Sequence, residues 1–216
     1  MDKPTVAVFD FDGTLTTRDT LPLFVDFVKG RGAFALAMLR RLPALWQYGI
    51  DRFGGKTADL SFVKEALLSP CFSGIACDDM QVTAQDFAAV VDGCLNRRVM
   101  QALRTHQEAG HQVAIASASP SVWIEPWASR HGISVVIATR MAVTDTGGKH
   151  RFTGLFEGAN CNGEEKRRRV EAVYPREHFR LVAYGNSRGD YPLLRYAQEA
   201  YLCTPRAITP FVSAPE

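Results

Sequence analysis

Two carboxylates near the N-terminus, Asp10 and Asp12, have a spacing that suggests chemistry. They follow an apolar run, residues 6–9, of the kind that forms a strand buried on both faces. If the chain stays extended past this run, residues two apart project to the same side, and Gly13 then lets the backbone turn. Two adjacent anionic groups need a cation or a shared proton to offset their repulsion. The stretch therefore indicates a metal-assisted or acid/base site, against the simpler interpretation of a turn.

Further polar side chains follow later candidate strands. Ser117 ends a second apolar run, and Asn186 and Asp190 follow a strand predicted at 180–184. Lys166 lies at the start of the helix that precedes this strand. Because open α/β sheets bind ligands at the carboxyl ends of their strands, we expect these groups to face one crevice. Carboxylates, a hydroxyl, an ammonium and an amide suit phosphoryl transfer, in which the protein positions the group and neutralises its charge.

The elements that must position these groups alternate between strand and helix. This alternation predicts an α/β fold with a Rossmann-like parallel sheet and helices on both faces. The predicted strands are 5–9, 112–116, 135–138, 180–184 and 200–203, and the predicted helices are 99–109, 121–131, 164–173 and 191–198. A turn at 145–148, flanked by 141–144 and 151–156, predicts a hairpin.

A long helical stretch interrupts the alternation after the first strand. Its predicted helices begin at the N-cap Asp19 and continue at 33–42, 44–50, 60–68 and 83–95, the last capped by Thr83 after a polar loop at 78–81. We therefore expect a helical cap at 18–95, inserted into a core formed by 1–17 and 96–216.

Composition limits the classes of partner. The chain has 216 residues, 46% of them hydrophobic, and a formal net charge of +2, which gives no electrostatic case for nucleic acid as a partner. Its five cysteines form no Cys-x-x-Cys pair, so reduced, structural thiols are expected. No apolar run approaches the eighteen or so residues of a membrane span, and no secretory signal precedes the first strand, so we expect no stable membrane insertion and a cytoplasmic protein. The oligomeric state is not indicated.

Four segments, DFDGTLT, IASAS, NGEEKRRRV and GNSRGDYPLL, resemble in order the four motifs of the haloacid dehalogenase superfamily of phosphatases. The helical insertion is similar to that of the phosphoserine phosphatase-like branch. The resemblance implies a phosphomonoester hydrolase that acts on a small phosphorylated metabolite, similar to phosphoserine. It implies that Asp10 is the nucleophile that becomes an aspartyl-phosphate and that Asp12 is the general acid/base. Ser117 and Lys166 then match the groups that hold the phosphoryl oxygens.

The resemblance also implies a Mg²⁺ cofactor. Its ligands would be the Asp10 carboxylate, the Asp12 backbone carbonyl and the motif from Asn186 to Asp190. Asn186 stands where the family usually has Asp, so the site has one formal negative charge fewer. We expect weaker Mg²⁺ binding or a larger role for Asp190.

Four further residues are expected to contact the substrate: Gly13, Ala118, Asp19 and Arg188. Asp19 resembles the acidic residue with which phosphoserine phosphatases bind the substrate amine, although an N-cap role is equally open. Arg188 could contact the substrate or cover the loop. Ser119 is expected in the turn before Pro120, where it offers backbone N–H groups.

Two alternatives stay open at this point. One is a phosphatase for a lipid phosphate or another bulky monoester, with a basic and apolar patch that contacts a membrane surface, although Pro43 argues against a long interfacial helix. This alternative depends on the patch Leu39, Arg40, Arg41 and Leu42 and on the cap aromatics Trp46, Tyr48 and Phe53. Aromatic residues at such spacing are more often cap core than the lining of a pocket. The other is a catalytically weak sensor of a phosphorylated ligand, for which the only argument is Asn186.

Overall fold

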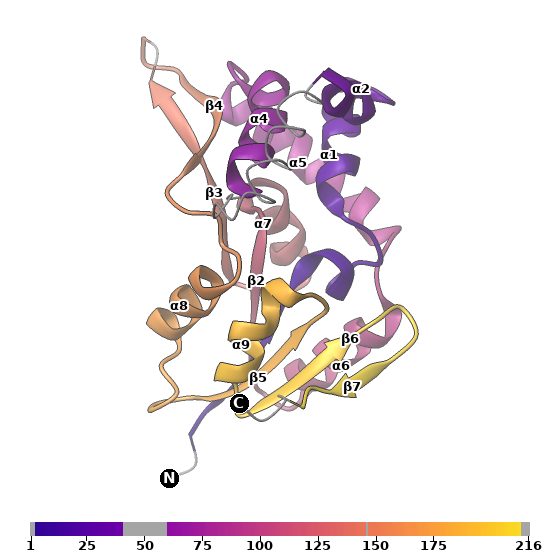
Figure 1. The fold of residues 1–216 in the computed structure, drawn as a ribbon, viewed down its shortest axis with the longest axis vertical. Helices are drawn as coiled ribbons and strands as arrows, with labels where there is room; N and C mark the ends of the chain where they lie inside the picture. The colour runs from indigo at the N-terminus through magenta and orange to yellow at the C-terminus, as the bar shows by residue number, and fades with distance from the viewer. Residues whose placement is uncertain (1–2, 41–59, 146, 213–216) are drawn as a thin grey trace, which may run out of the picture.

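A seven-stranded sheet with the strand order β4-β3-β2-β1-β5-β6-β7 forms the centre of the molecule (Figure 1). The computed structural model describes residues 3–40, 60–145 and 147–212. The strands are β1 (Thr5–Phe9), β2 (Gln112–Pro120), β3 (Val135–Asp145), β4 (His150–Glu157), β5 (Arg180–Gly185), β6 (Glu199–Cys203) and β7 (Ile208–Pro210). Strands β3, β2, β1, β5 and β6 are parallel, whereas β4 and β7 pair antiparallel at the two edges. The predicted α/β class is therefore confirmed, with a sheet that is mixed at its edges.

Strand β1 is the middle of this sheet because it is apolar on both faces. Ala7 and Phe9 belong to the hydrophobic cluster on one side of the sheet, and Val6 and Val8 belong to the cluster on the other. All four side chains are fully buried, as the continuous apolar run predicts. This burial fixes where the carboxyl end of β1 lies.

Helices cover both faces of the sheet. On the Phe9 side, α6 (Arg97–Glu108) and α7 (Ser121–Arg130) contribute buried residues such as Leu103 and Trp123. On the other side, α8 (Glu164–Val173) and α9 (Tyr191–Tyr196) contribute Val170 and Leu194. The predicted coverage of both faces is confirmed.

The helical stretch gathers beyond the carboxyl ends of the parallel strands, at the top of Figure 1. Its described helices are α1 (Thr20–Lys29), α2 (Ala33–Arg40), α4 (Leu60–Phe72) and α5 (Cys77–Asp92). The β3–β4 hairpin packs against it: Phe156 N donates to Glu65 Oε1 at 2.7 Å, and a Cβ added to Gly154 would lie 2.3 Å from Ser69 Cα. Within residues 3–40, 60–145 and 147–212, no helix has the length and apolar composition of a membrane span. The division at 17/18 and 95/96 stays a prediction.

Two helix boundaries were predicted wrongly. Helix α5 begins at Cys77, with Ala76 as its N-cap, and not at Thr83. The predicted polar loop 78–81 is its first turn, where Asp78 and Asp79 interact favourably with the helix dipole. Helix α4 continues through Pro70 to Phe72 instead of ending at the proline, because Phe72 is buried in the core.

The strand predictions also need correction. The third strand and the first arm of the hairpin are one continuous strand, β3, and β7 was not predicted. Strand β2 extends to Pro120, so Ser119 lies in a strand and not in a turn. Several predictions fall outside the described residues: the helix at 44–50, the aromatics Trp46, Tyr48 and Phe53, and Arg41, Leu42 and Pro43.

Candidate active site

The carboxyl end of β1 leads directly into the predicted site. Asp10 N donates to the carbonyl oxygen of Tyr184 at 2.9 Å, which ties the end of β1 to β5. The chain then turns through Gly13, whose φ of 77° lies in the left-handed region that favours glycine. Thr14 closes the turn, since its hydroxyl donates to Asp10 Oδ2 at 2.9 Å.

A buried ammonium joins two carboxylates at this point. Lys166 Nζ, on the first turn of α8, lies 2.8 Å from Asp10 Oδ1 and 2.5 Å from Asp190 Oδ1. The lysine is 1% exposed. Burial opposes its charge, but the two carboxylates outweigh burial and raise the pKa of Lys166. Three residues far apart in the sequence therefore meet as the strand-end argument predicts.

The two carboxylates of this group differ in their pKa values. Burial, reinforced by the charge of Asp190, raises the pKa of Asp10 to about 7 despite the attraction of Lys166. For Asp190, burial is outweighed by Lys166 and by hydrogen bonds from the backbone of Ser187 and Asn186, which lower its pKa. Asp190 is thus a fixed anion, whereas Asp10 carries a charge that a nearby cation would stabilise.

Asp12 lies in a separate polar environment. Its Oδ1 accepts hydrogen bonds from the backbone N–H and the hydroxyl of Thr20, both at 2.7 Å, and its Oδ2 accepts one from the Ser119 hydroxyl at 2.5 Å. Burial and the neighbouring charge of Asp19 raise the pKa of Asp12, while these hydrogen bonds lower it. The net shift is upward, so Asp12 holds a proton more readily than an exposed aspartate.

The end of β2 lies beside Asp12 and contributes further polar groups. Ser117 is buried, and its Oγ accepts a hydrogen bond from Ser119 N at 3.1 Å. The carbonyl oxygen of Ala118 accepts from the Thr139 hydroxyl at 3.0 Å and from Lys64 Nζ at 3.2 Å. Sequence reasoning did not find this use of the Ser119 side chain, because the residue was expected in a turn.

Lys64 is a second residue that sequence reasoning missed. It comes from α4 in the helical stretch, and burial lowers its pKa while Asp19 and Asp12 oppose this shift. Its ammonium therefore lies close enough to Asp12 and Asp19 to interact with their charges. No signal in the sequence distinguishes it from a lysine on the exposed face of an amphipathic helix.

The loop after β5 is organised around Asp190. Asp190 Oδ2 accepts from Asn186 N at 3.1 Å, from Ser187 N at 3.0 Å and from the Ser187 hydroxyl at 2.9 Å. The Asn186 side chain lies against Gly13, where an added Cβ would be 2.0 Å from Asn186 Nδ2. Asn186 is thereby placed beside the turn that follows Asp10.

The donors in this region suit a hard cation. They are the Asp10 carboxylate, the Asn186 side-chain amide and the Asp12 backbone carbonyl, all oxygen donors of the kind that Mg²⁺ prefers. Within the described part of the chain, no cluster of three or more His, Cys, Asp or Glu side chains is arranged to hold a metal. Asp190 Oδ1 contacts Lys166 Nζ, and its Oδ2 accepts hydrogen bonds from Asn186 N, Ser187 N and the Ser187 hydroxyl. Direct metal binding by Asp190 stays a prediction.

Two further predicted substrate-binding residues are Asp19 and Arg188. Asp19 is the N-cap of α1, since its Oδ1 accepts from Leu21 N at 3.0 Å, and its charge also raises the pKa of Asp12. The predicted N-cap role of Asp19 is confirmed. Contact between Asp19 and a substrate amine stays a prediction. Arg188 is exposed on the Asp190 loop, and its role also stays a prediction.

The chain is similar in sequence to a known family of hydrolases and to several individual proteins. The family model of haloacid dehalogenase-like hydrolases matches residues 7–195. The chain is 31% identical over 198 residues to protein CicA of Caulobacter vibrioides, covering 91% of this chain and 85% of that protein. It is 25% identical over 210 residues to a probable phosphatase of Mycobacterium tuberculosis, covering 93% of this chain and 69% of that protein.

The fold is also shared with a solved structure of a substrate-bound phosphoserine phosphatase. The TM-score is 0.60 at 15% identity, and the match covers 93% of this chain and 86% of the other. At this identity the likeness concerns the fold, and it agrees with the predicted phosphoserine phosphatase-like architecture. The match of the family model over nearly the whole chain establishes that this protein belongs to the haloacid dehalogenase-like hydrolases.

Proposed function

We propose that this hydrolase is a Mg²⁺-dependent phosphomonoesterase that works through an aspartyl-phosphate on a small phosphorylated metabolite. One observation carries the proposal: two neighbouring aspartates have different surroundings. Asp10 contacts the Lys166 ammonium, whereas the described residues that donate hydrogen bonds to Asp12 are the neutral Thr20 and Ser119. Two carboxyl groups in unlike environments are suited to unlike roles.

In the first step, a carboxylate oxygen of Asp10 attacks phosphorus. An oxygen–phosphorus bond forms to Asp10, and the bond between phosphorus and the ester oxygen breaks. Asp12, with its raised pKa, donates its proton to the departing oxygen, so that an alcohol leaves. The Thr14 hydroxyl and the Lys166 ammonium orient the attacking carboxylate.

In the second step, water attacks the phosphorus of the aspartyl-phosphate. Asp12, now ionised, accepts a proton from this water, and the bond between phosphorus and the Asp10 oxygen breaks to release phosphate. The Ser117 hydroxyl, the Lys166 ammonium and the backbone N–H groups at Gly13 and Ala118 are proposed to hold the phosphoryl oxygens. Asp12 ends the cycle protonated, ready for the next substrate.

The proposed metal would be held by the Asp10 carboxylate, the Asp12 carbonyl oxygen and the Asn186 amide oxygen, with Asp190 behind them. When bound, Mg²⁺ supplies positive charge that offsets the repulsion between a carboxylate and a phosphate dianion. The raised pKa of Asp10 supports this assignment, because a site that favours an added cation also favours an added proton.

The surroundings of the reacting groups support a small substrate. Lys64 and Asp19 bring one charge of each sign toward the site from the helical stretch, so a metabolite with a further charged group would find a partner there. We also propose a cytoplasmic protein, because all five cysteines are free thiols, as is usual in a reducing compartment.

The test is hydrolysis of p-nitrophenyl phosphate by the purified full chain, with and without added Mg²⁺. Turnover that needs the metal and is lost in Asp10→Asn supports the proposal. A screen of phosphorylated metabolites and lipid phosphates then separates a small substrate from a bulky one. Binding of a phosphate analogue without any turnover would instead support the alternative of a phospho-ligand sensor.

A further inference from the structure

Helix α2 has an unusual surface for a helix on the outside of a globular domain. Seven of its eight residues are apolar, and none of its side chains is buried. One side is half-buried against the core, whereas Leu36 and Leu39 on the outer side are 47% and 62% exposed. Surface helices normally place polar residues outward. An apolar outer face of this kind marks a surface that contacts a partner.

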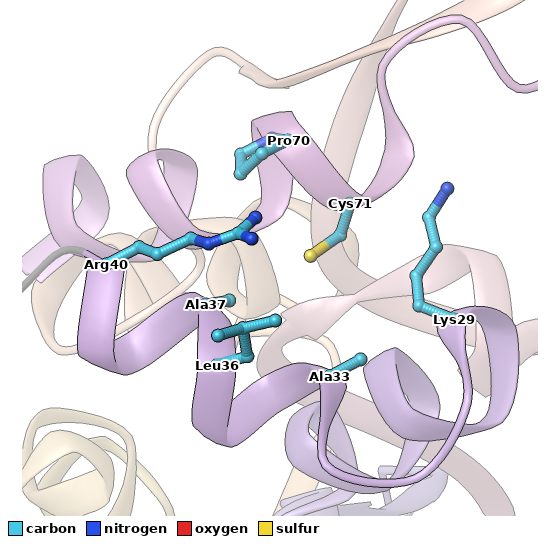
Figure 2. A pocket seen from close by; sticks show the side chains of 7 residues that line it. All are labelled: Lys29, Ala33, Leu36, Ala37, Arg40, Pro70 and Cys71. Atoms are coloured by element: carbon cyan, nitrogen blue, oxygen red, sulfur yellow. The ribbon is translucent and has the colours of Figure 1, made fainter.

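A groove of about 450 Å³ runs beside this helix, between α2 and α4 (Figure 2). Ala33, Leu36 and Ala37 form one wall, and Pro70 and Cys71 of α4 form the other. The volume lies in the range of pockets that hold small molecules, about 300 to 1,000 Å³. The groove therefore adds a concave apolar surface to the exposed side of α2.

The described charged residues that line this groove, Lys29 and Arg40, are both basic. Figure 2 shows Lys29 and Arg40 on opposite sides of the apolar residues, and Arg31 is exposed in the turn between α1 and α2. None of the described residues that line the groove is acidic. The neighbouring Asp26 is held within the fold, since its Oδ1 accepts from Phe34 N at 2.8 Å. An apolar centre with a cationic margin matches an apolar partner that carries anionic groups.

We propose that α2 and this groove dock on the surface of an anionic lipid bilayer. Leu36 and Leu39 enter the interface between headgroups and acyl chains, and Lys29, Arg31 and Arg40 contact lipid phosphates. This is peripheral association, which needs no membrane-spanning helix. A second copy of this chain is the weaker candidate, because a symmetric contact through α2 would bring the same cations together. The proposal goes beyond the phosphatase reaction and does not depend on it.

The experiment is flotation of the full chain with vesicles of equimolar phosphatidylglycerol and phosphatidylcholine, and with vesicles of phosphatidylcholine alone. We expect binding to the anionic vesicles only, and binding that weakens with added salt. The double variant Leu36→Gln/Leu39→Gln and the double variant Lys29→Glu/Arg40→Glu should each bind at least tenfold more weakly, since one cation alone contributes about fivefold.

Matched controls keep the result specific to this surface. Val82→Gln removes an apolar side chain that is 60% exposed on α5, and Arg206→Glu reverses an exposed charge between β6 and β7; both should bind as the wild type does. Asp10→Asn should also bind normally, which separates this proposal from the proposed reaction. Circular dichroism checks that each variant is folded.

Three outcomes would overturn the proposal. The first is that the chain binds neutral vesicles as well as anionic ones. The second is that it binds neither kind of vesicle. The third is that the control variants lose as much vesicle binding as the variants of α2 and its basic margin. A wild-type dimer in size-exclusion chromatography that becomes monomeric in Leu36→Gln, without vesicle binding, would assign the surface to a second copy instead. If the leucine variant fails to fold, the charge-reversal variant still decides the question.

Discussion

The Ser119 hydroxyl donates a 2.5 Å hydrogen bond to Oδ2 of Asp12, and so joins the end of β2 to the turn after β1. The other oxygen of Asp12, Oδ1, accepts a hydrogen bond from the Thr20 hydroxyl. This hydroxyl in turn accepts a hydrogen bond from Trp123 Nε1 at 2.9 Å. The proposed acid/base is thereby held from two sides, by the core sheet and by the first helix of the helical stretch. Its position depends on both parts of the molecule.

The first prediction concerns this bond. Ser119→Ala removes one of the three hydrogen-bond donors to Asp12. The Asp12 side chain is then less firmly oriented, and the pKa of Asp12 rises further because the Ser119 hydrogen bond lowers it. We expect kcat to fall by about ten- to a hundredfold with KM little changed, because the loss is in proton transfer and not in binding. The basic limb of the pH profile should move to higher pH. Ser129→Ala, on the exposed side of α7, should leave both constants unchanged, and an equal fall there would refute the positioning role of Ser119.

The second prediction concerns Lys64, whose Nζ contacts the Ala118 carbonyl. Lys64→Met removes a partly desolvated charge from the substrate side of the site. For a phosphomonoester with a second anionic group, we expect KM to rise by about tenfold, the size of one charge-assisted hydrogen bond, with kcat little affected. For p-nitrophenyl phosphate, KM should change much less. Lys149→Met, in the exposed hairpin turn, is the matched control, and the same rise in KM for both substrates would count against a recognition role.

Much of the site could be predicted from the sequence because strand ends are local signals. Asp10, Ser117 and Asp190 each follow an apolar run, and parallel pairing brings the ends of such runs to one edge of the sheet. The bridge that Lys166 forms between two carboxylates then follows from the strand order β2-β1-β5 together with α8.

The contacts that sequence reasoning missed depend on packing between distant elements. Lys64 reaches Ala118 only because α4 lies over the strand ends, and nothing near residue 64 in the sequence indicates that approach. Ser119 was predicted in a turn because Pro120 follows it, whereas strand β2 extends to the proline. The start of α5 was missed because Thr83 resembles a cap, yet its hydroxyl donates to the carbonyl of Asp79 inside the helix.

The third prediction concerns the amide at position 186. Asn186→Asp adds a negative charge beside the turn at Gly13, where the proposed cation binds. We expect Mg²⁺ to bind about tenfold more tightly in calorimetric titration, because carboxylates bind this ion more strongly than amides do. Gln198→Glu adds the same charge near the start of β5, where residue 198 accepts from Leu181 N at 2.7 Å, and should leave binding unchanged. Unchanged binding in Asn186→Asp would exclude residue 186 as a ligand.

The fourth prediction concerns stability and pH. His106 Nδ1 lies 2.8 Å from His111 Nδ1, and its Nε2 lies 3.0 Å from the Tyr184 hydroxyl. Burial, and secondarily His111, lowers the pKa of His106 below its ordinary value of 6.5. The unfolded chain therefore binds this proton first, so the stabilisation is present above about pH 6.5 and is lost as the pH falls through the lowered pKa.

The measurement is urea unfolding at about pH 7.5 and about pH 5.5. His106→Gln should lose less stability than the wild type between these two values, by up to about 1 kcal/mol, because the group is only partly shielded from solvent. His178→Gln, at an exposed position, should retain the wild-type slope. A slope in His106→Gln as steep as in the wild type would show that another group causes the pH dependence.

The most direct test of the account is to trap the acyl-phosphate on Asp10. The enzyme is mixed with p-nitrophenyl phosphate and Mg²⁺, quenched in acid and treated with borohydride, which reduces an aspartyl-phosphate to homoserine. Homoserine is expected at position 10 of the wild-type peptide, and none is expected in Asp10→Asn or without substrate. Steady turnover with no modification at position 10, or a phosphoryl group found on another residue, would contradict it.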